Sequence, residues 1–73
     1  MPQFFTIKYS KNALKFLQKQ DKPTQRRLIN AISNLPAAGD IKKLQGTDGY
    51  RLRVGNFRVL FDVDGTIIDI IDI

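Results

Sequence analysis

A predicted β-hairpin is the feature of this sequence that most constrains the fold. Tyr50–Val54 alternates strictly between apolar and basic residues, Gly55-Asn56 is a two-residue hairpin turn, and Phe57–Val63 resumes extended structure. A second turn at Asp64-Gly65 leads into Thr66–Ile73, which is rich in isoleucine. The chain from residue 50 onward therefore predicts a three-stranded antiparallel meander.

The last predicted strand has isoleucine at both parities. The isoleucines are Ile67, Ile71 and Ile73 on one face, and Ile68 and Ile70 on the other. A strand that is apolar on both sides is typical of a sheet interior covered on both faces. We therefore expect another strand beside it, and Phe4–Tyr9, rich in aromatic and β-branched residues, is the predicted neighbour.

Two short helices are predicted between the strands. Ser10 can cap a first helix over Lys11–Lys19, and the second runs from about Pro23 to Asn34, after the capping acid Asp21. The apolar stripes are Ala13, Leu14 and Leu17 in the first helix, and Leu28, Ile32 and Leu35 in the second. Two helices joined by a few residues lie antiparallel, as a hairpin.

The remaining segments are predicted loops. Pro36–Asp40 and Gln45–Gly49 flank the short stretch Ile41–Leu44 on the approach to the β-hairpin. The predicted order is therefore β-α-α-β-β-β. We expect an α+β fold in which an antiparallel sheet packs on a two-helix hairpin, forming a single domain over residues 1–73.

Missing residue types exclude several kinds of chemistry. The sequence contains no cysteine, histidine, tryptophan or glutamate. Disulfides, thiol catalysis, iron–sulfur clusters, cysteine- or histidine-ligated metals and a histidine general base are therefore excluded. We expect no cofactor and no metal. Without a signal peptide or a membrane span in the sequence, we expect a soluble cytoplasmic protein with no membrane partner.

The charge is unevenly distributed along the chain. The net charge is +5, but residues 1–58 hold twelve basic and three acidic side chains, a balance of +9. Residues 59–73 hold four aspartates and no base, a balance of −4. The basic part favours an anionic partner, with nucleic acid the first candidate and an acidic protein segment the second.

The predicted hairpin gathers arginines on one face of the sheet. A two-residue turn at Gly55-Asn56 sets Arg53 opposite Arg58, with Arg51 two residues along on the same face. Like charges directly opposite each other destabilise a sheet, so folding gives no reason for this placement, whereas phosphate binding does. The alternative is that the arginines are solvated or paired with Asp62 and Asp69 on neighbouring strands.

Lysines form two further candidate surfaces for RNA binding. Lys42 and Lys43 could extend the arginine cluster, although a Lys-Lys pair in a loop also serves solubility. Lys11, Lys15 and Lys19 recur one turn apart on the first helix. With Lys22, Arg26 and Arg27 they make the helical hairpin basic, and a solvated face is an equal alternative to a surface that binds nucleic acid.

The chain resembles the RelE/ParE superfamily of bacterial toxins from type II toxin–antitoxin systems. The resemblance rests on Ile41–Gly46 and on the hairpin Tyr50–Val63, and the order of the other elements matches over essentially the whole chain. RelE-like members are ribosome-dependent endoribonucleases that cut messenger RNA and so inhibit translation. ParE-like members inhibit DNA gyrase. The resemblance implies that a cognate antitoxin wraps and neutralises the chain.

The resemblance also implies site residues and a reaction. Basic residues of RelE-like toxins contact the scissile phosphate from the strands flanking the hairpin turn, and these positions correspond to Arg51, Arg53 and Arg58. The implied chemistry is attack of a ribose 2′-hydroxyl on phosphorus, and arginine suits charge neutralisation better than proton transfer.

RelE-like chains usually continue past the last strand through a segment carrying an arginine and a tyrosine that take part in cleavage. This sequence ends at Ile73, and we expect a shortened, weakened or inactive messenger RNA endonuclease. The alternatives are a ParE-like gyrase inhibitor and a binding-only form that engages the antitoxin.

Overall fold

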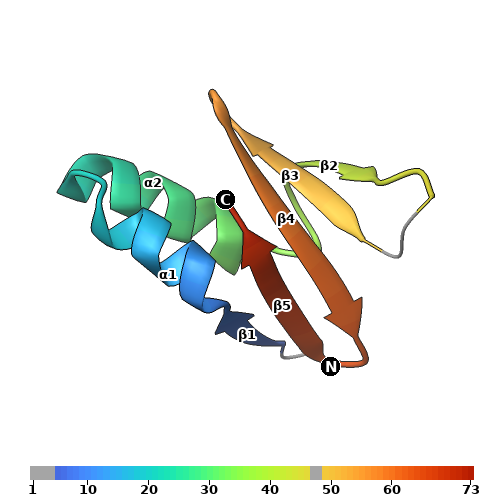
Figure 1. The fold of residues 1–73 in the computed structure, drawn as a ribbon. Coiled ribbons are helices and arrows are strands. Elements are labelled where there is room, and N and C mark those ends of the chain that lie inside the picture. Colours follow the sequence, from blue (N-terminus) through green and yellow to red (C-terminus); the bar gives the residue numbers. More distant parts are fainter. Residues whose placement is uncertain (1–4, 47–48) are drawn as a thin grey trace.

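Two helices and a five-stranded sheet make up the computed structural model, which describes residues 5–46 and 49–73 (Figure 1). The elements are β1 (Thr6–Tyr9), α1 (Lys11–Gln18), α2 (Lys22–Ser33), β2 (Asp40–Lys43), β3 (Tyr50–Val54), β4 (Phe57–Asp64) and β5 (Ile67–Asp72). The strand order across the sheet is β1-β5-β4-β3-β2. The predicted α+β class and the succession of predicted elements are confirmed. Phe4, placed in the first strand, and Thr47-Asp48, placed in a loop, lie outside the described residues.

The sequence-based prediction was wrong about the segment before the hairpin. Asp40–Lys43 is the strand β2, antiparallel to β3, and not a loop. Ile41 pairs with Leu52 and packs against the core, while the other β2 residues are exposed. An edge strand needs only one hydrogen-bonded neighbour and tolerates charged residues. With two lysines among its four residues, β2 therefore lacks the apolar pattern by which a strand is predicted.

The first strand lies beside the last one as predicted, but it runs parallel to it. β1 pairs with β5 from Thr6 opposite Ile67 to Tyr9 opposite Ile70, so the sheet is mixed rather than wholly antiparallel. The side-chain pattern of a strand reports which faces are buried and carries no information about strand direction. The helical hairpin supplies the long connection that a parallel pair requires.

The core lies between the helices and one face of the sheet. Leu28 and Ile32 of α2 are fully buried with Val59, Phe61 and the other members of a single cluster. Figure 1 shows both helices along the same side of the sheet. The opposite face, called here the open face, is covered by neither α1 nor α2. A sheet made mostly of antiparallel strands commonly has one face packed on the core and the other in solvent.

The prediction that β5 is covered on both faces was therefore wrong. β5 lies inside the sheet, and Ile68 and Ile70 are buried, but Ile67 is only half-buried and Ile71 is 48% exposed. The pairing register of β4 with β5 also shifts between Leu60 and Phe61. The helical hairpin covers only one of the two faces that carry isoleucine.

Side-chain hydrogen bonds fix the helices to the sheet and to each other. The Ser10 hydroxyl accepts from the Ala13 N–H (3.1 Å), which confirms its capping role, and donates to the Ile71 carbonyl (2.6 Å). The Gln25 amide donates to the Leu17 carbonyl (2.7 Å) and so joins α2 to the end of α1. Within the described residues, neither helix is long and apolar enough to cross a membrane.

Candidate functional site

The register of the β3–β4 hairpin places the arginines as predicted. Leu52 lies opposite Val59 on the core side, and Arg53 lies opposite Arg58 on the open face. Gly55 has a φ of 58°, the conformation required at the first central residue of a type II′ turn. Because side chains alternate along a strand, Arg51 lies on the same face as Arg53.

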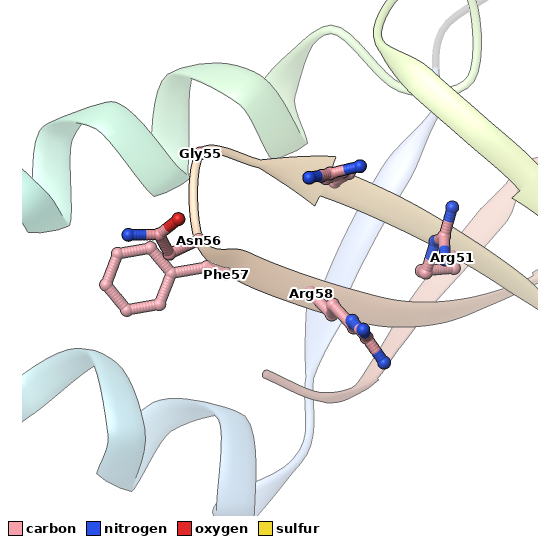
Figure 2. A pocket seen from close by; sticks show the side chains of 6 residues that line it. Arg51, Gly55, Asn56, Phe57 and Arg58 are labelled. Carbon is pink, nitrogen blue, oxygen red and sulfur yellow. The ribbon is translucent and has the colours of Figure 1, made fainter.

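The three arginines line a shallow hollow next to the turn. Its volume is about 260 Å³, and its lining residues are Arg51, Arg53, Gly55, Asn56, Phe57 and Arg58. Figure 2 shows Arg51 and Arg58 on the two adjacent strands, with Gly55 and Asn56 at the turn. We call this site the arginine hollow. All of its ionisable side chains are permanent cations, so it suits a polyanion.

Arg51 is the most constrained member of the hollow. Arg53 and Arg58 are exposed, whereas Arg51 is half-buried and its Nε atom is buried without a hydrogen-bond partner. A buried donor without an acceptor costs about 1–3 kcal/mol, and more when it is charged. The exposed guanidinium groups of Arg53 and Arg58 are therefore the ones open to a bound oxyanion.

The aspartates predicted as possible partners, Asp62 and Asp69, form no hydrogen bond with an arginine in the described part of the chain. Asp62 lies opposite Asp69, and the Asp62 carboxylate accepts from the Val63 N–H (2.8 Å). Among residues 5–46 and 49–73, no side-chain hydrogen bond involves an arginine. The hydrogen bonds thus give no support to the alternative in which carboxylates satisfy the arginines.

The structure separates the two lysines of β2. Lys42 lies opposite Arg51 on the open face, whereas Lys43 lies opposite Tyr50 on the other face. Both lysines are exposed. Lys42 therefore extends the basic surface of the arginine hollow, and Lys43 does not, because a strand sends successive side chains to opposite faces.

The lysines of the first helix do not join the arginine hollow. Lys11 and Lys15 on α1, and Lys19 at its C-cap, are exposed and absent from the lining. The helix packs on the covered side of the sheet through Ala13 and Leu17. These lysines form a separate surface.

The aromatic side chains near the hollow belong to the core. Tyr50 stacks on Phe61 with ring centroids 5.4 Å apart, and Phe57 makes an edge-to-face contact with Phe16 at 5.7 Å. The second contact attaches the tip of the hairpin to α1. These contacts use the rings in packing rather than as platforms for bases.

The lining of the hollow limits its chemistry. It can bind and orient a phosphodiester and neutralise charge, but it contains no carboxylate, lysine or tyrosine that could accept a proton. Burial raises the pKa of Tyr9, which is not among the lining residues. In the described part of the chain, no group of three or more metal-ligating side chains could hold a metal ion.

Sequence reasoning did not foresee the roles of two residues near the hollow. Asn56 lines it but was predicted only as a turn residue. Arg27 was expected only as part of the basic surface of the helical hairpin, but it brings a further guanidinium to the turn, next to Gly55. The sequence could not show this contact, because it depends on how α2 packs on the β3–β4 hairpin.

Comparison with known proteins identifies related folds and a family. The model of the ParE toxin family, from the type II toxin–antitoxin system parDE, matches residues 7–73. A chain of the archaeal RelE–RelB complex from Pyrococcus horikoshii OT3 is 29% identical, with a TM-score of 0.78, over 93% of this chain and 90% of that one.

Two further solved structures are similar. A chain of the RelB–RelE complex from Methanococcus jannaschii is 28% identical, with a TM-score of 0.73, over 89% of this chain and 85% of that one. A chain of the YoeB–YefM complex from Staphylococcus aureus shares the fold at 24% identity, with a TM-score of 0.74 and coverage of 93% and 92%. A search of the curated proteins found no match.

The opposed arginines predict an unusual effect of mutation on stability. Replacing Arg58 by Gln removes the charge facing Arg53. Since like charges directly opposite each other cost about 0.2–1 kcal/mol, the free energy of unfolding should rise by about that amount at low salt. The gain should shrink at about 1 M salt, where charges are screened within about 3 Å.

Urea unfolding of wild type, Arg58→Gln and the control Arg26→Gln at both salt concentrations measures this effect. Arg26 is exposed on α2 and does not line the hollow. A loss of stability in Arg58→Gln that Arg26→Gln does not share would mean that a carboxylate partner holds Arg58.

Proposed function

Because this chain belongs to the RelE/ParE superfamily of toxins from type II toxin–antitoxin systems, we propose that it acts on RNA as a RelE-like toxin. Its arginine hollow binds the backbone of messenger RNA on the ribosome, and cleavage there inhibits translation. The observation that carries the proposal is the hollow itself, which Arg51, Arg53 and Arg58 line together on the face of the sheet opposite the two helices. Phosphate oxygens fit this donor set in number and charge.

The proposed reaction is an internal transfer at one phosphodiester. The ribose 2′-oxygen attacks the adjacent phosphorus, the bond from phosphorus to the 5′-oxygen breaks, and a 2′,3′-cyclic phosphate and a 5′-hydroxyl result. Arg51, Arg53 and Arg58 neutralise the negative charge that grows on the phosphoryl oxygens. They also hold the phosphate in one orientation, which lowers the entropic part of the barrier.

Proton transfer is the step that the arginine hollow does not assist. A guanidinium keeps its proton near neutral pH, so arginine does not take the 2′-hydroxyl proton. Water or hydroxide accepts the proton instead, and water supplies the proton that the leaving 5′-oxygen needs to become a hydroxyl. The chain is therefore a slow nuclease whose main activity is binding. If cleavage is too slow to matter, the chain acts only by binding RNA.

The match to the ParE family supports a second candidate target. ParE-like members inhibit DNA gyrase, so this chain would bind a protein rather than cut RNA. The arginine hollow favours RNA because it provides three guanidinium groups that can donate hydrogen bonds to phosphate, and because it lies on the open face. A gyrase supercoiling assay with wild type and Arg58→Gln separates the two candidates.

The proposed partner is an acidic antitoxin. The similar solved structures are toxin–antitoxin complexes, and this chain offers such a partner both charge and apolar surface. Carboxylates of the antitoxin would neutralise Arg53 and Arg58, and an apolar side chain would cover Ile71, which is 48% exposed. An antitoxin bound in this way excludes RNA by occupying the same cations.

The neighbouring lysines of β2 test the proposed RNA surface. Replacing Lys42 by Gln should weaken binding of single-stranded RNA and reduce the slope of log K against log salt by about 0.7, the value for one lost phosphate contact. The matched control Lys43→Gln makes the same change in charge one residue away, on the opposite face. Fluorescence anisotropy across a salt series measures both. Equal effects of the two substitutions would show that only net charge matters.

The absence of a general base in the arginine hollow predicts the pH dependence of cleavage. If hydroxide takes the proton, the single-turnover rate on programmed ribosomes should rise about tenfold per pH unit between about pH 6 and about pH 8. Quenched-flow sampling of one radiolabelled messenger gives this rate. A bell-shaped profile centred near neutrality would require a titrating group that the hollow does not contain.

The antitoxin proposal predicts a gain in heat stability. A peptide that binds only the folded chain stabilises it by about 2.7 kcal/mol at one hundred times its dissociation constant. Thermal melts with an acidic amphipathic antitoxin peptide should therefore shift upward, and Arg53→Gln with Arg58→Gln should reduce the shift. No shift for wild type at saturating peptide would rule out an antitoxin site on this chain.

A further inference from the structure

The tip of the β3–β4 hairpin lies against a fourth arginine, which comes from a different part of the chain. A Cβ built on Gly55 would lie 3.0 Å from Nη2, 3.3 Å from Cζ and 3.5 Å from Nη1 of Arg27. The guanidinium of Arg27 therefore rests directly on the turn. Gly55 also lines the arginine hollow, so the turn separates Arg27, which is not among the lining residues, from the hollow.

The packing of α2 explains how Arg27 reaches the turn. Leu28 and Ile32 are fully buried and fix the rotation of the helix about its axis. Successive residues of a helix are separated by about 100°, so Arg27 lies at the flank of the buried stripe while Arg26 points nearly opposite to it. Figure 2 shows α2, the pale green helix, beside the turn at Gly55.

The contact depends on glycine at position 55 for two reasons. The φ of 58° is a conformation that side chains other than glycine rarely adopt. A Cβ would also enter the space occupied by Nη2 of Arg27. The turn thus leaves a place at the tip of the hairpin for a guanidinium, although a cation there lies close to a site that is already strongly positive.

The position of Arg27 is not explained by a contribution to the stability of the fold. Arg27 is exposed, and no side-chain hydrogen bond of residues 5–46 and 49–73 involves it. Its donors remain available to a ligand. A strand of nucleic acid carries one phosphate per nucleotide, so a strand whose phosphate occupies the hollow needs cations next to the hollow, not only in it.

We propose that Arg27 binds the phosphate neighbouring the one in the arginine hollow, so that single-stranded RNA runs from β3–β4 over the Gly55 turn onto α2. This inference rests on the proposed RNA-directed function. It adds a path for the RNA across the surface and a second phosphate-binding position. Arg27 is a binding residue for the flanking nucleotide. The reacting phosphate contacts Arg51, Arg53 and Arg58.

Short RNAs with different numbers of phosphates test the inference. The probes are a 2′-O-methylated dinucleotide with one bridging phosphate and a 2′-O-methylated trinucleotide with two, neither of which can be cleaved. NMR titrations in a salt series give the affinity and salt slope for wild type, Arg27→Gln, Arg27→Lys, Arg26→Gln and Arg58→Gln. Arg26→Gln is the matched control, because it removes the same charge from the adjacent residue of the same helix.

Arg27→Gln should weaken trinucleotide binding and reduce its salt slope by about 0.7, while dinucleotide binding changes no more than in Arg26→Gln. Arg27→Lys should restore the salt slope, because it keeps the charge. Arg58→Gln should weaken the binding of both probes. This combination supports the inference.

Two other results would overturn it in distinguishable ways. If Arg27→Gln matches Arg26→Gln for both probes while Arg58→Gln loses affinity, the path over the turn is wrong and the proposed function stands. If Arg58→Gln also binds both probes as tightly as wild type does, the proposed function and the inference fail together.

Discussion

The pairing register of β3 with β4 determines both the core and the site. With Leu52 opposite Val59, the apolar side chains face the helices, and the same register necessarily sets Arg53 opposite Arg58 on the other face. A slip by one residue would bury the arginines and expose the apolar side chains. The hydrophobic effect, acting on one face, therefore holds cations together on the other against their mutual repulsion.

This arrangement separates the source of stability from the source of function. The buried cluster that includes Leu28, Ile32 and Phe61 provides the stabilising contacts, and it lies entirely on the helix side of the sheet. The open face carries the repulsion between Arg53 and Arg58 and the partnerless Nε of Arg51. In the proposed function, a bound phosphate would offset the repulsion between the exposed arginines.

The hairpin was predictable because its signals agree with one another. Strict alternation in Tyr50–Val54 and a two-residue turn leave one register, and the positions of the three arginines follow from it. The assignment of β2 failed because a four-residue edge strand with two lysines has almost no period to detect. The direction of β1 and the open second face of β5 depend on where the helices pack, which local patterns do not encode.

Local patterns also do not encode contacts between distant elements. The buried Nε of Arg51 and the approach of Arg27 to Gly55 arise only when the sheet and the helical hairpin are assembled. The charge count predicted an anionic partner for the basic part of the chain. It did not distinguish Lys42 from Lys43. These lysines are adjacent on one strand, so their side chains lie on opposite faces of the sheet.

The most direct test of the central claim observes the arginine side chains themselves. The chain contains five arginines, so their Nε–Hε signals in a nitrogen–proton NMR spectrum are few enough to assign. Titration with an uncleavable single-stranded RNA should shift the signals of Arg51, Arg53 and Arg58 strongly and leave that of Arg26 in place. Shifts confined to residues of the helical hairpin, with the Arg51 signal unchanged, would contradict phosphate binding in the arginine hollow.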